Sequence, residues 1–116
     1  MNLKHGDIVL VDLEPSKGSE QGKERPAVII QNNLGNKHSP TTIVAPMTSS
    51  YDKVYPMNVE IESENSDIDK DSVILLNQIV TVDIETRIKS KFGELSREKM
   101  AEVERAIEIS LGLKEV

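Results

Sequence analysis

The sequence predicts a mainly β protein in which a small, strongly bent antiparallel sheet, or partly closed barrel, is followed by one C-terminal helix. Short apolar runs rich in β-branched residues recur up to residue 92, and Gly, Pro, Ser and Asn separate them. After Gly93 the apolar residues recur every three or four positions, which is the period of a helix. With 116 residues the chain has the length of one domain, so we expect residues 1–116 to form a single unit.

The first two predicted strands lie at residues 8–11 and 27–30. The first is an apolar run bounded by a Gly-Asp pair and by Pro15, a length and composition typical of a buried strand. The second follows Pro26, which a strand tolerates at its start. Residues 14–24 contain two Gly, one Pro and no apolar residue, so we expect a long loop between the two strands.

After a predicted connection at residues 32–40, further strands are expected at residues 41–45, 57–62, 73–76 and 87–92. In the second of these, apolar and polar residues alternate, which is the pattern of a half-buried strand. The last also alternates, and this places Lys89 and Lys91 on one face. Together these segments supply enough strands for a closed or nearly closed sheet.

The C-terminal segment is predicted to be the only long helix. Ser96 is a suitable N-cap, and Gly112 a suitable end, for a helix whose first apolar stripe is Met100, Val103, Ile107 and Leu111. A second stripe on roughly the opposite side consists of Ala106, Ile109 and Leu113. Because the core of a small barrel covers one stripe, we expect something else to cover the other, and a partner subunit is one candidate.

Composition excludes several classes of function. The chain has no cysteine, which excludes disulfides, thiolate metal sites and cysteine nucleophiles and suits a reducing compartment. It has neither an apolar signal region nor a run long enough to cross a bilayer, so we expect a cytoplasmic protein with no membrane association. The net charge of -6 counts against binding to nucleic acid, although residues 1–60 carry six Lys or Arg against seven Asp or Glu, so most of the acidity lies in the second half.

Two motifs in the first third of the chain carry a family resemblance. The run Gly-Ser-Glu-Gln-Gly at residues 18–22 is followed by Arg-Pro-Ala-Val-Ile-Ile-Gln-Asn at residues 25–32. In this order, after the Gly-Asp pair of the first strand, they resemble the MazF/PemK toxins, the mRNA interferases of type II toxin–antitoxin systems. Thr48, Pro56 and residues 71–76 continue the likeness, so that it extends over almost the whole chain.

The resemblance implies an SH3-like small antiparallel barrel with a terminal helix, the CcdB/MazF-type plasmid maintenance toxin fold. It also implies a homodimer that acts as a sequence-specific endoribonuclease on single-stranded RNA, needs no metal or other cofactor, and is inhibited by a cognate MazE-like antitoxin. One segment departs from the pattern, because similar proteins often have Glu-Gln-Ile-Arg where this chain has Asn77, Gln78, Ile79 and Val80. We expect this departure to alter a contact to RNA or between subunits.

Arg25 and Thr48 are the predicted catalytic residues. When the 2′-hydroxyl of RNA attacks the neighbouring phosphate, a dianionic phosphorane forms, and a guanidinium can contact two of its oxygens at once. The resemblance assigns this task to Arg25, whose high pKa argues against proton abstraction; from the residues alone it is equally a surface arginine at a strand end. Thr48 can donate its hydroxyl to a phosphoryl oxygen, although residues 46–50 also read as an ordinary hydroxyl-rich turn.

Six further residues are predicted to bind the substrate: Ser19, Glu20, Gln21, Ser49, Tyr55 and Gln78. Glu20 is the only carboxylate in the loop motif, so it is a candidate for accepting the 2′-hydroxyl proton or for binding a base edge, and equally for a solvated loop position. Tyr55, like Tyr51, follows Thr48 at a place where a base could stack, and packing of the loop is the alternative.

The remaining candidates for chemistry are weaker. His5 and His38 are the only imidazoles, and both are predicted to be solvated, as is the acidic segment at residues 62–71. A second hypothesis is a non-catalytic module of the same fold, either a gyrase-poison-like protein or a degenerate toxin that only binds its antitoxin. The pair of Arg25 and Thr48 distinguishes the two hypotheses, because a binding module has no need of it.

Overall fold

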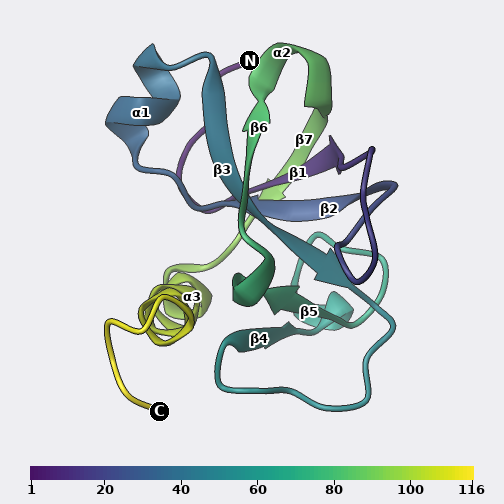
Figure 1. Ribbon diagram of the computed structural model, residues 1–116, viewed down its shortest axis with the longest axis vertical. Helices are drawn as coiled ribbons and strands as arrows, with labels where there is room; N and C mark the ends of the chain where they lie inside the picture. Colours follow the sequence, from purple (N-terminus) through teal and green to yellow (C-terminus); the bar gives the residue numbers. More distant parts are fainter.

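The computed structural model describes residues 1–116, apart from the side chain of Asn65, and its strands form one bent antiparallel sheet (Figure 1). The strand order is β4-β5-β3-β2-β1-β7, and β6 pairs with β3 beside this path. The strands are β1 Asp7–Asp12, β2 Glu24–Ile29, β3 Thr41–Thr48, β4 Asn58–Ile61, β5 Ser72–Leu75, β6 Val80–Asp83 and β7 Ile88–Glu94. The helices are α1 Asn33–His38, α2 Ile84–Arg87 and α3 Arg97–Ser110, with 3₁₀ turns η1 Ser63–Asn65 and η2 Leu76–Gln78. The predicted mainly β class with a C-terminal helix is confirmed.

Strand β3 is the centre of the sheet and bends it. Its first half pairs with β6, its middle with β2, and its end with β5. The sequence predicted a strand only as far as Ala45, and the next residue, Pro46, cannot donate to a sheet ladder. In the structure β3 passes from β6 to β5 around Pro46, so the missing N–H lies where the strand changes partner. This continuation carries the strand as far as Thr48.

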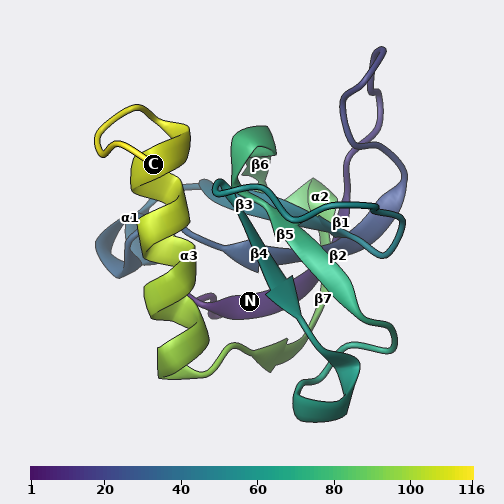
Figure 2. The same ribbon diagram turned by 90° about the horizontal axis from the view of Figure 1, so that it is seen from below.

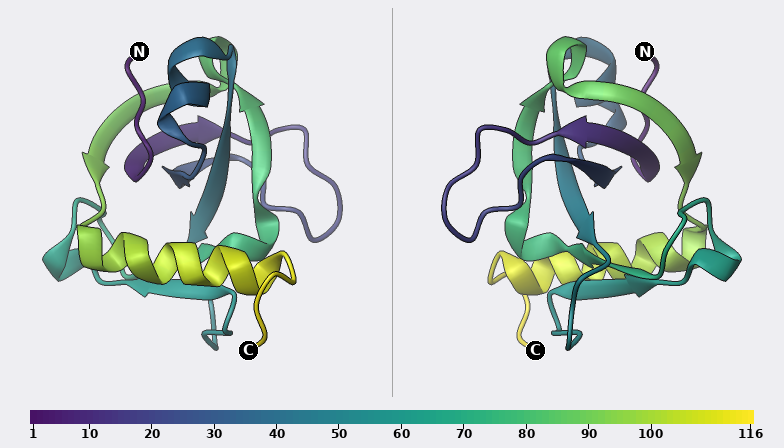
Figure 3. Two further views of the ribbon diagram at one scale, coloured as in Figure 1. Left: turned by 90° about the vertical axis from the view of Figure 1, so that its left-hand side faces the viewer. Right: turned by 90° about the vertical axis from the view of Figure 1, so that its right-hand side faces the viewer.

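Two groups of buried apolar residues stabilise the fold. One fills the space between the sheet and α3, which runs along one side of the barrel (Figure 3). The other is enclosed by β1, β2, β3, β6 and β7. Strand β1 contributes Ile8 to the first group and Val9 and Val11 to the second. Burial on both faces explains why its sequence is a continuous apolar run rather than an alternating one.

Helix α3 begins as predicted, because the Ser96 hydroxyl accepts a hydrogen bond of 3.1 Å from the backbone N–H of Lys99. Its core face consists of Met100, Val103 and Ala106. The prediction that Ala106 belongs to an opposite stripe is wrong: it follows Val103 by three residues, lies on the same face and is only 2% exposed. No helix of the described residues is long and apolar enough to span a bilayer.

Three elements were not predicted: α1, β6 and α2. Helix α1 lies in the expected connection, where the side chain of Asn32 caps it by accepting a bond of 2.8 Å from the N–H of Gly35. Its sequence is polar and contains Gly, so it has no apolar stripe from which a helix could be predicted. In β6 only Val82 is buried, and α2 has no buried residue, so neither has a periodic pattern.

Candidate active site

Arg25, Thr48 and Ser49 lie together in a cleft of about 640 Å³. Arg25 is in β2 and Thr48 is the last residue of β3, two strands that pair side by side through residues 27–29 of β2. The predicted catalytic pair, 23 positions apart in the sequence, is thus brought together by the sheet. Glu24, Phe92, Asp67 and Asp69 also line this cleft, and the sequence had marked none of these four as a site residue.

The guanidinium of Arg25 is half-buried and held by two backbone carbonyls. Its Nε donates to the carbonyl of Gly22 at 2.8 Å, and one Nη donates to the carbonyl of Met47 at 3.2 Å. The first bond links it to the loop before β2 and the second to β3. Guanidinium has five N–H groups, so three remain without a partner among the described residues. Arg25 is therefore fixed in place and still able to bind an anion.

The hydroxyl of Thr48 lies in a short turn at the end of β3. It accepts a hydrogen bond of 3.1 Å from the N–H of Ser50, and it donates a long one, of 3.4 Å between oxygens, to the carbonyl of the same residue. The accepted bond orients the oxygen, while the long donated bond is weak. The hydroxyl proton is therefore available to a ligand in the cleft.

A second cleft, of about 490 Å³, adjoins the first at Thr48 and Ser50, which line both. Gln21, Tyr55 and Gln78 line the second cleft, together with Tyr51 and Asn77. The Tyr51 hydroxyl donates to a carboxylate oxygen of Glu60 at 3.0 Å, and burial together with this bond raises the pKa of Tyr51. The two clefts form a surface on which an extended ligand could pass Thr48.

Gln78 connects the loop between β1 and β2 to the rest of the site. Its amide nitrogen donates to the carbonyl of Ser19 at 3.0 Å, and its amide oxygen accepts from the N–H of Gln21 at 3.0 Å. This loop projects from the barrel (Figure 2), so a contact to η2 limits its movement. Ser19 lines neither cleft, and its part in the site is the backbone carbonyl that accepts the hydrogen bond from Gln78.

Glu14 orders the other end of the same loop. Its carboxylate accepts hydrogen bonds from the N–H of Lys23 at 2.5 Å and from the N–H and hydroxyl of Ser16, and these bonds lower the pKa of Glu14 below its ordinary value of 4.5. A Cβ at Gly22 would lie 2.3 Å from the Ser16 hydroxyl, so only glycine allows this close approach. Lys23 has a φ of 63°, in the left-handed region that favours glycine. The loop before Arg25 is thus tightly built.

Glu24, a carboxylate that the sequence analysis did not consider, is better placed in the structure than Glu20. Glu20 accepts a hydrogen bond of 2.9 Å from the N–H of Lys17 and lines neither cleft. Glu24, adjacent to Arg25, lines the cleft that holds Arg25 and Thr48. The sequence missed Glu24 because it lies outside the Gly-Ser-Glu-Gln-Gly motif.

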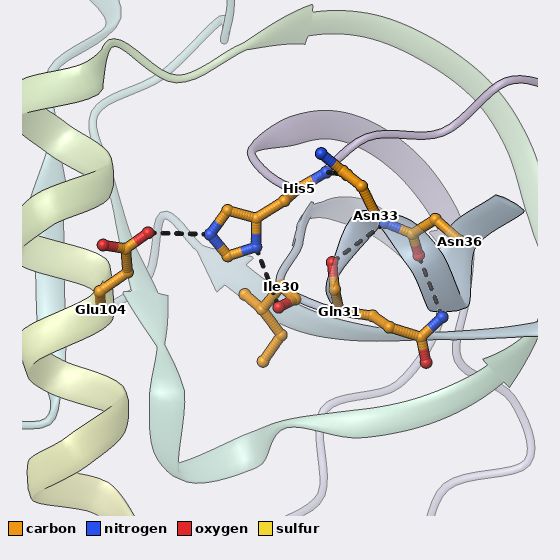
Figure 4. Close-up of polar contacts among 6 residues, drawn as sticks. All are labelled: His5, Ile30, Gln31, Asn33, Asn36 and Glu104. Carbon is orange, nitrogen blue, oxygen red and sulfur yellow. Dashed lines mark hydrogen bonds and ion pairs between the residues drawn. The ribbon is translucent and has the colours of Figure 1, made fainter.

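The prediction that His5 is solvated is wrong. The ring is half-buried: Nδ1 lies 3.0 Å from the carbonyl of Ile30, and Nε2 lies 2.9 Å from a carboxylate oxygen of Glu104 on α3 (Figure 4). It thus links the N-terminal segment to the terminal helix. His38 is exposed, as predicted. Neither imidazole lines the two clefts, and the described residues contain no group of three or more His, Cys, Asp or Glu that could hold a metal ion.

Comparison with known proteins assigns the family. Residues 4–111 match the family described as PemK-like, MazF-like toxin of type II toxin-antitoxin system. The chain belongs to this family. It is 54% identical over 112 residues to the Endoribonuclease MazF of Staphylococcus epidermidis and 55% identical to that of Staphylococcus saprophyticus, and each match covers 96% of this chain and 92% of the relative.

Solved structures of related toxins have the same fold. MazF from Deinococcus radiodurans superposes with a TM-score of 0.82 at 25% identity, and the match covers 97% of this chain and 98% of that one. A mycobacterial endoribonuclease, solved in complex with its cognate antitoxin, gives 0.80 at 18% identity over 98% of this chain and 99% of that one. The predicted CcdB/MazF-type fold is confirmed.

The residues that depart from the family pattern lie at two different places in this toxin. Asn77 lines the second cleft, where its side-chain oxygen is 3.4 Å from the amide nitrogen of Asn58. Val80 opens β6, pairs with Val44 and is 41% exposed. Asn77 is therefore near the candidate substrate surface, and Val80 adds an apolar side chain to the outside of the barrel.

Proposed function

We propose that this toxin, an endoribonuclease, cuts single-stranded RNA by attack of the RNA's own 2′-hydroxyl on the neighbouring phosphate, without a metal ion. The proposal rests on the meeting of Arg25 and Thr48 in one cleft. The 2′-oxygen forms a bond to phosphorus while the bond from phosphorus to the 5′-oxygen breaks. The products are a 2′,3′-cyclic phosphate and a 5′-hydroxyl.

In this scheme Arg25 stabilises the phosphorane. Its three free N–H groups can donate to two phosphoryl oxygens, and the two bonds to Gly22 and Met47 hold it in position before the charge develops. Thr48 donates its hydroxyl proton to a phosphoryl oxygen and so shares the same charge. Both contributions are strongest in the transition state, where the phosphorane carries its second negative charge.

The proton of the attacking 2′-hydroxyl passes to Glu24, and the departing 5′-oxygen takes up a proton from the solvent, to which Glu24 later releases its own. Of the two glutamates near Arg25 in the sequence, Glu24 is the one that lines the cleft, whereas Glu20 is engaged within its own loop. A carboxylate can accept this proton, whereas a guanidinium stays protonated and cannot. Ser49, Gln21, Tyr55 and Gln78 then bind the nucleotides on either side, because they line the two clefts that meet at Thr48.

The reaction is tested by incubating the purified protein with single-stranded RNA of mixed sequence in the presence of a chelator. We expect cleavage that leaves 2′,3′-cyclic phosphate and 5′-hydroxyl ends. Cleavage that chelator abolishes and magnesium restores would contradict the metal-independent reaction. The alternative of a non-catalytic module is not favoured, because relatives at 54% and 55% identity are named endoribonucleases.

We also propose a homodimer that uses the C-terminal end of α3. Ser110 donates its hydroxyl to the carbonyl of Leu76 at 2.8 Å, so this end of the helix lies beside η2 (Figure 3). Leu111 and Leu113, 54% and 74% exposed, leave an apolar surface there. Sedimentation should give a dimer that Leu113→Glu dissociates; Leu34→Glu, at a residue 73% exposed on α1, is the control. A folded wild-type monomer at micromolar concentration would contradict the dimer.

A cognate antitoxin of the MazE type is the proposed protein partner, supported by the mycobacterial relative solved with its antitoxin. We place the toxin in the cytoplasm, where its RNA substrate is found, and treat residues 1–116 as one folding unit. A single cooperative melting transition would support the last point, and two separate transitions would contradict it.

A further inference from the structure

Phe92 is an exposed aromatic ring in the cleft of Arg25. The alternating pattern of residues 87–92 predicts that Phe92 lies on the same face of the strand as Ile88, which is buried. The pairing of β1 with β7 shifts register twice, so the alternation is broken and Phe92 is 40% exposed. A Phe at this exposure, on the wall of a cleft and not in the core, has an apolar ring available to a ligand.

The 67–70 segment lines the same cleft and is held there by three features. Ile68 is buried in the core between the sheet and α3. Asp67 accepts a weak hydrogen bond of 3.4 Å from the N–H of Glu94 in β7. A Cβ at Gly93 would lie 2.4 Å from the Asp67 carboxylate, so the absence of a side chain at Gly93 permits this approach. Asp69 and Lys70 are thereby placed on the cleft wall.

The charges in the cleft determine how an RNA strand would lie. Two cations, Arg25 and Lys70, line the cleft. Lys70 lies in the same segment as Asp67 and Asp69, whose carboxylates would repel a phosphate, so Arg25 is the cation better placed to bind one. A nucleotide therefore places its phosphate toward Arg25 and Thr48 and its base toward the wall that contains Asp69 and Phe92. A carboxylate on that wall can accept hydrogen bonds only from the donor groups of a base.

We propose that Phe92 and Asp69 form a base-binding subsite beside the reacting phosphate. The base stacks on the ring of Phe92, and Asp69 accepts a hydrogen bond from its exocyclic amino group. Adenine, cytosine and guanine have such a group, whereas uracil has one ring N–H between two carbonyls that repel the carboxylate. The subsite therefore discriminates against uracil. This inference depends on the proposed RNA-cleaving function.

Stacking is tested by the affinity for single-stranded DNA of mixed sequence, which lacks the attacking hydroxyl and cannot be cut by the proposed reaction. We expect Phe92→Ala to weaken binding by about 5- to 150-fold, the range measured for one stacked base. Phe92→Tyr should restore binding, because it keeps the ring. Leu34→Ala, at an exposed apolar residue outside both clefts, should have no effect. Unchanged affinity in a folded Phe92→Ala protein would overturn the subsite.

Base choice is tested by sequencing the ends cut from a random RNA library. We expect the wild type to disfavour uracil at one position next to the cut, and Asp69→Asn to accept it there, because an amide can donate to a uracil carbonyl. Glu85→Gln removes the same charge at an exposed residue outside both clefts and should leave the preference unchanged. An identical preference in all three proteins would contradict the role of Asp69.

The base subsite and the proposed reaction can be wrong independently of each other. If Arg25→Ala abolishes cleavage while Phe92→Ala and Asp69→Asn behave as the wild type, the base subsite is wrong and the proposed reaction stands. If Arg25→Ala cuts RNA at the wild-type rate, the proposed reaction is wrong. If the wild type cuts no RNA and Phe92→Ala still binds DNA as well as the wild type does, both are wrong.

Discussion

Replacing Arg25 by alanine should remove catalysis while the protein remains folded. The variant loses the cation that stabilises the phosphorane, and a transition-state arginine contributes about 10³- to 10⁵-fold to turnover, or about 4 to 7 kcal/mol. It also loses the hydrogen bonds to Gly22 and Met47. Each such bond contributes about 0.5 to 1.5 kcal/mol to stability, and water can replace the guanidinium at the cleft.

The free energy of unfolding should therefore fall by about 1 to 2 kcal/mol, with a decrease in Tm of about 4 to 10 °C. Arg25→Lys should recover little activity, since one ammonium cannot bind both carbonyls and two phosphoryl oxygens. The assay is cleavage at saturating RNA, with a melting curve for each variant. A folded Arg25→Ala protein that cuts at the wild-type rate would refute the assignment, and full activity in Arg25→Lys would show that only a diffuse charge is needed.

Three further predictions concern the same site. Thr48→Val should lower turnover by about 10²- to 10³-fold at nearly unchanged stability; a change below about threefold would remove Thr48 from the reaction. Glu24→Gln should lower turnover by about 10²- to 10⁴-fold and remove the acidic limb of the pH profile. Glu20→Gln should lower turnover by less than about tenfold. If Glu20→Gln has the larger effect on turnover, Glu20 is the base. The ionised Glu14 carboxylate stabilises its loop above the ordinary pKa of 4.5, and this stability should be lost as pH falls through the lowered pKa of the folded protein. NMR should show the Lys23 amide signal move in that range, and a signal that moves equally in Glu14→Gln would exclude the carboxylate as the cause.

The elements with strong local patterns could be predicted from the sequence. Strand β1 has a continuous apolar run because both its faces are buried, and α3 has a cap and a buried stripe at helical spacing. Helix α1 could not be predicted, because polar side-chain contacts, and not an apolar stripe, hold it in place. The side chain of its buried Asn36 accepts a hydrogen bond from the side-chain amide of Gln31 and donates one to the backbone carbonyl of Gln31 (Figure 4). It also accepts one from the hydroxyl of the buried Thr42.

In the candidate site, too, some residues could be predicted from the sequence and others could not. Arg25 and Thr48 were identifiable because they lie in motifs, and the sheet brings them into one cleft. Phe92 was not identifiable, because two register shifts in the pairing of β1 with β7 reverse the expectation from alternation. The role of the 67–70 segment depends on its position against Gly93, a contact between two distant parts of the chain. Local spacing contains no information about such contacts.

The most direct test of the central claim is an RNA in which only the nucleotide before the cut has a 2′-hydrogen in place of the 2′-hydroxyl. If the substrate's own hydroxyl is the nucleophile, this bond should resist cleavage in the presence of a chelator, while the matched all-ribose RNA is cut to a 2′,3′-cyclic phosphate and a 5′-hydroxyl. Cleavage of both RNAs at similar rates would contradict the account, because the nucleophile would then have to come from outside the RNA.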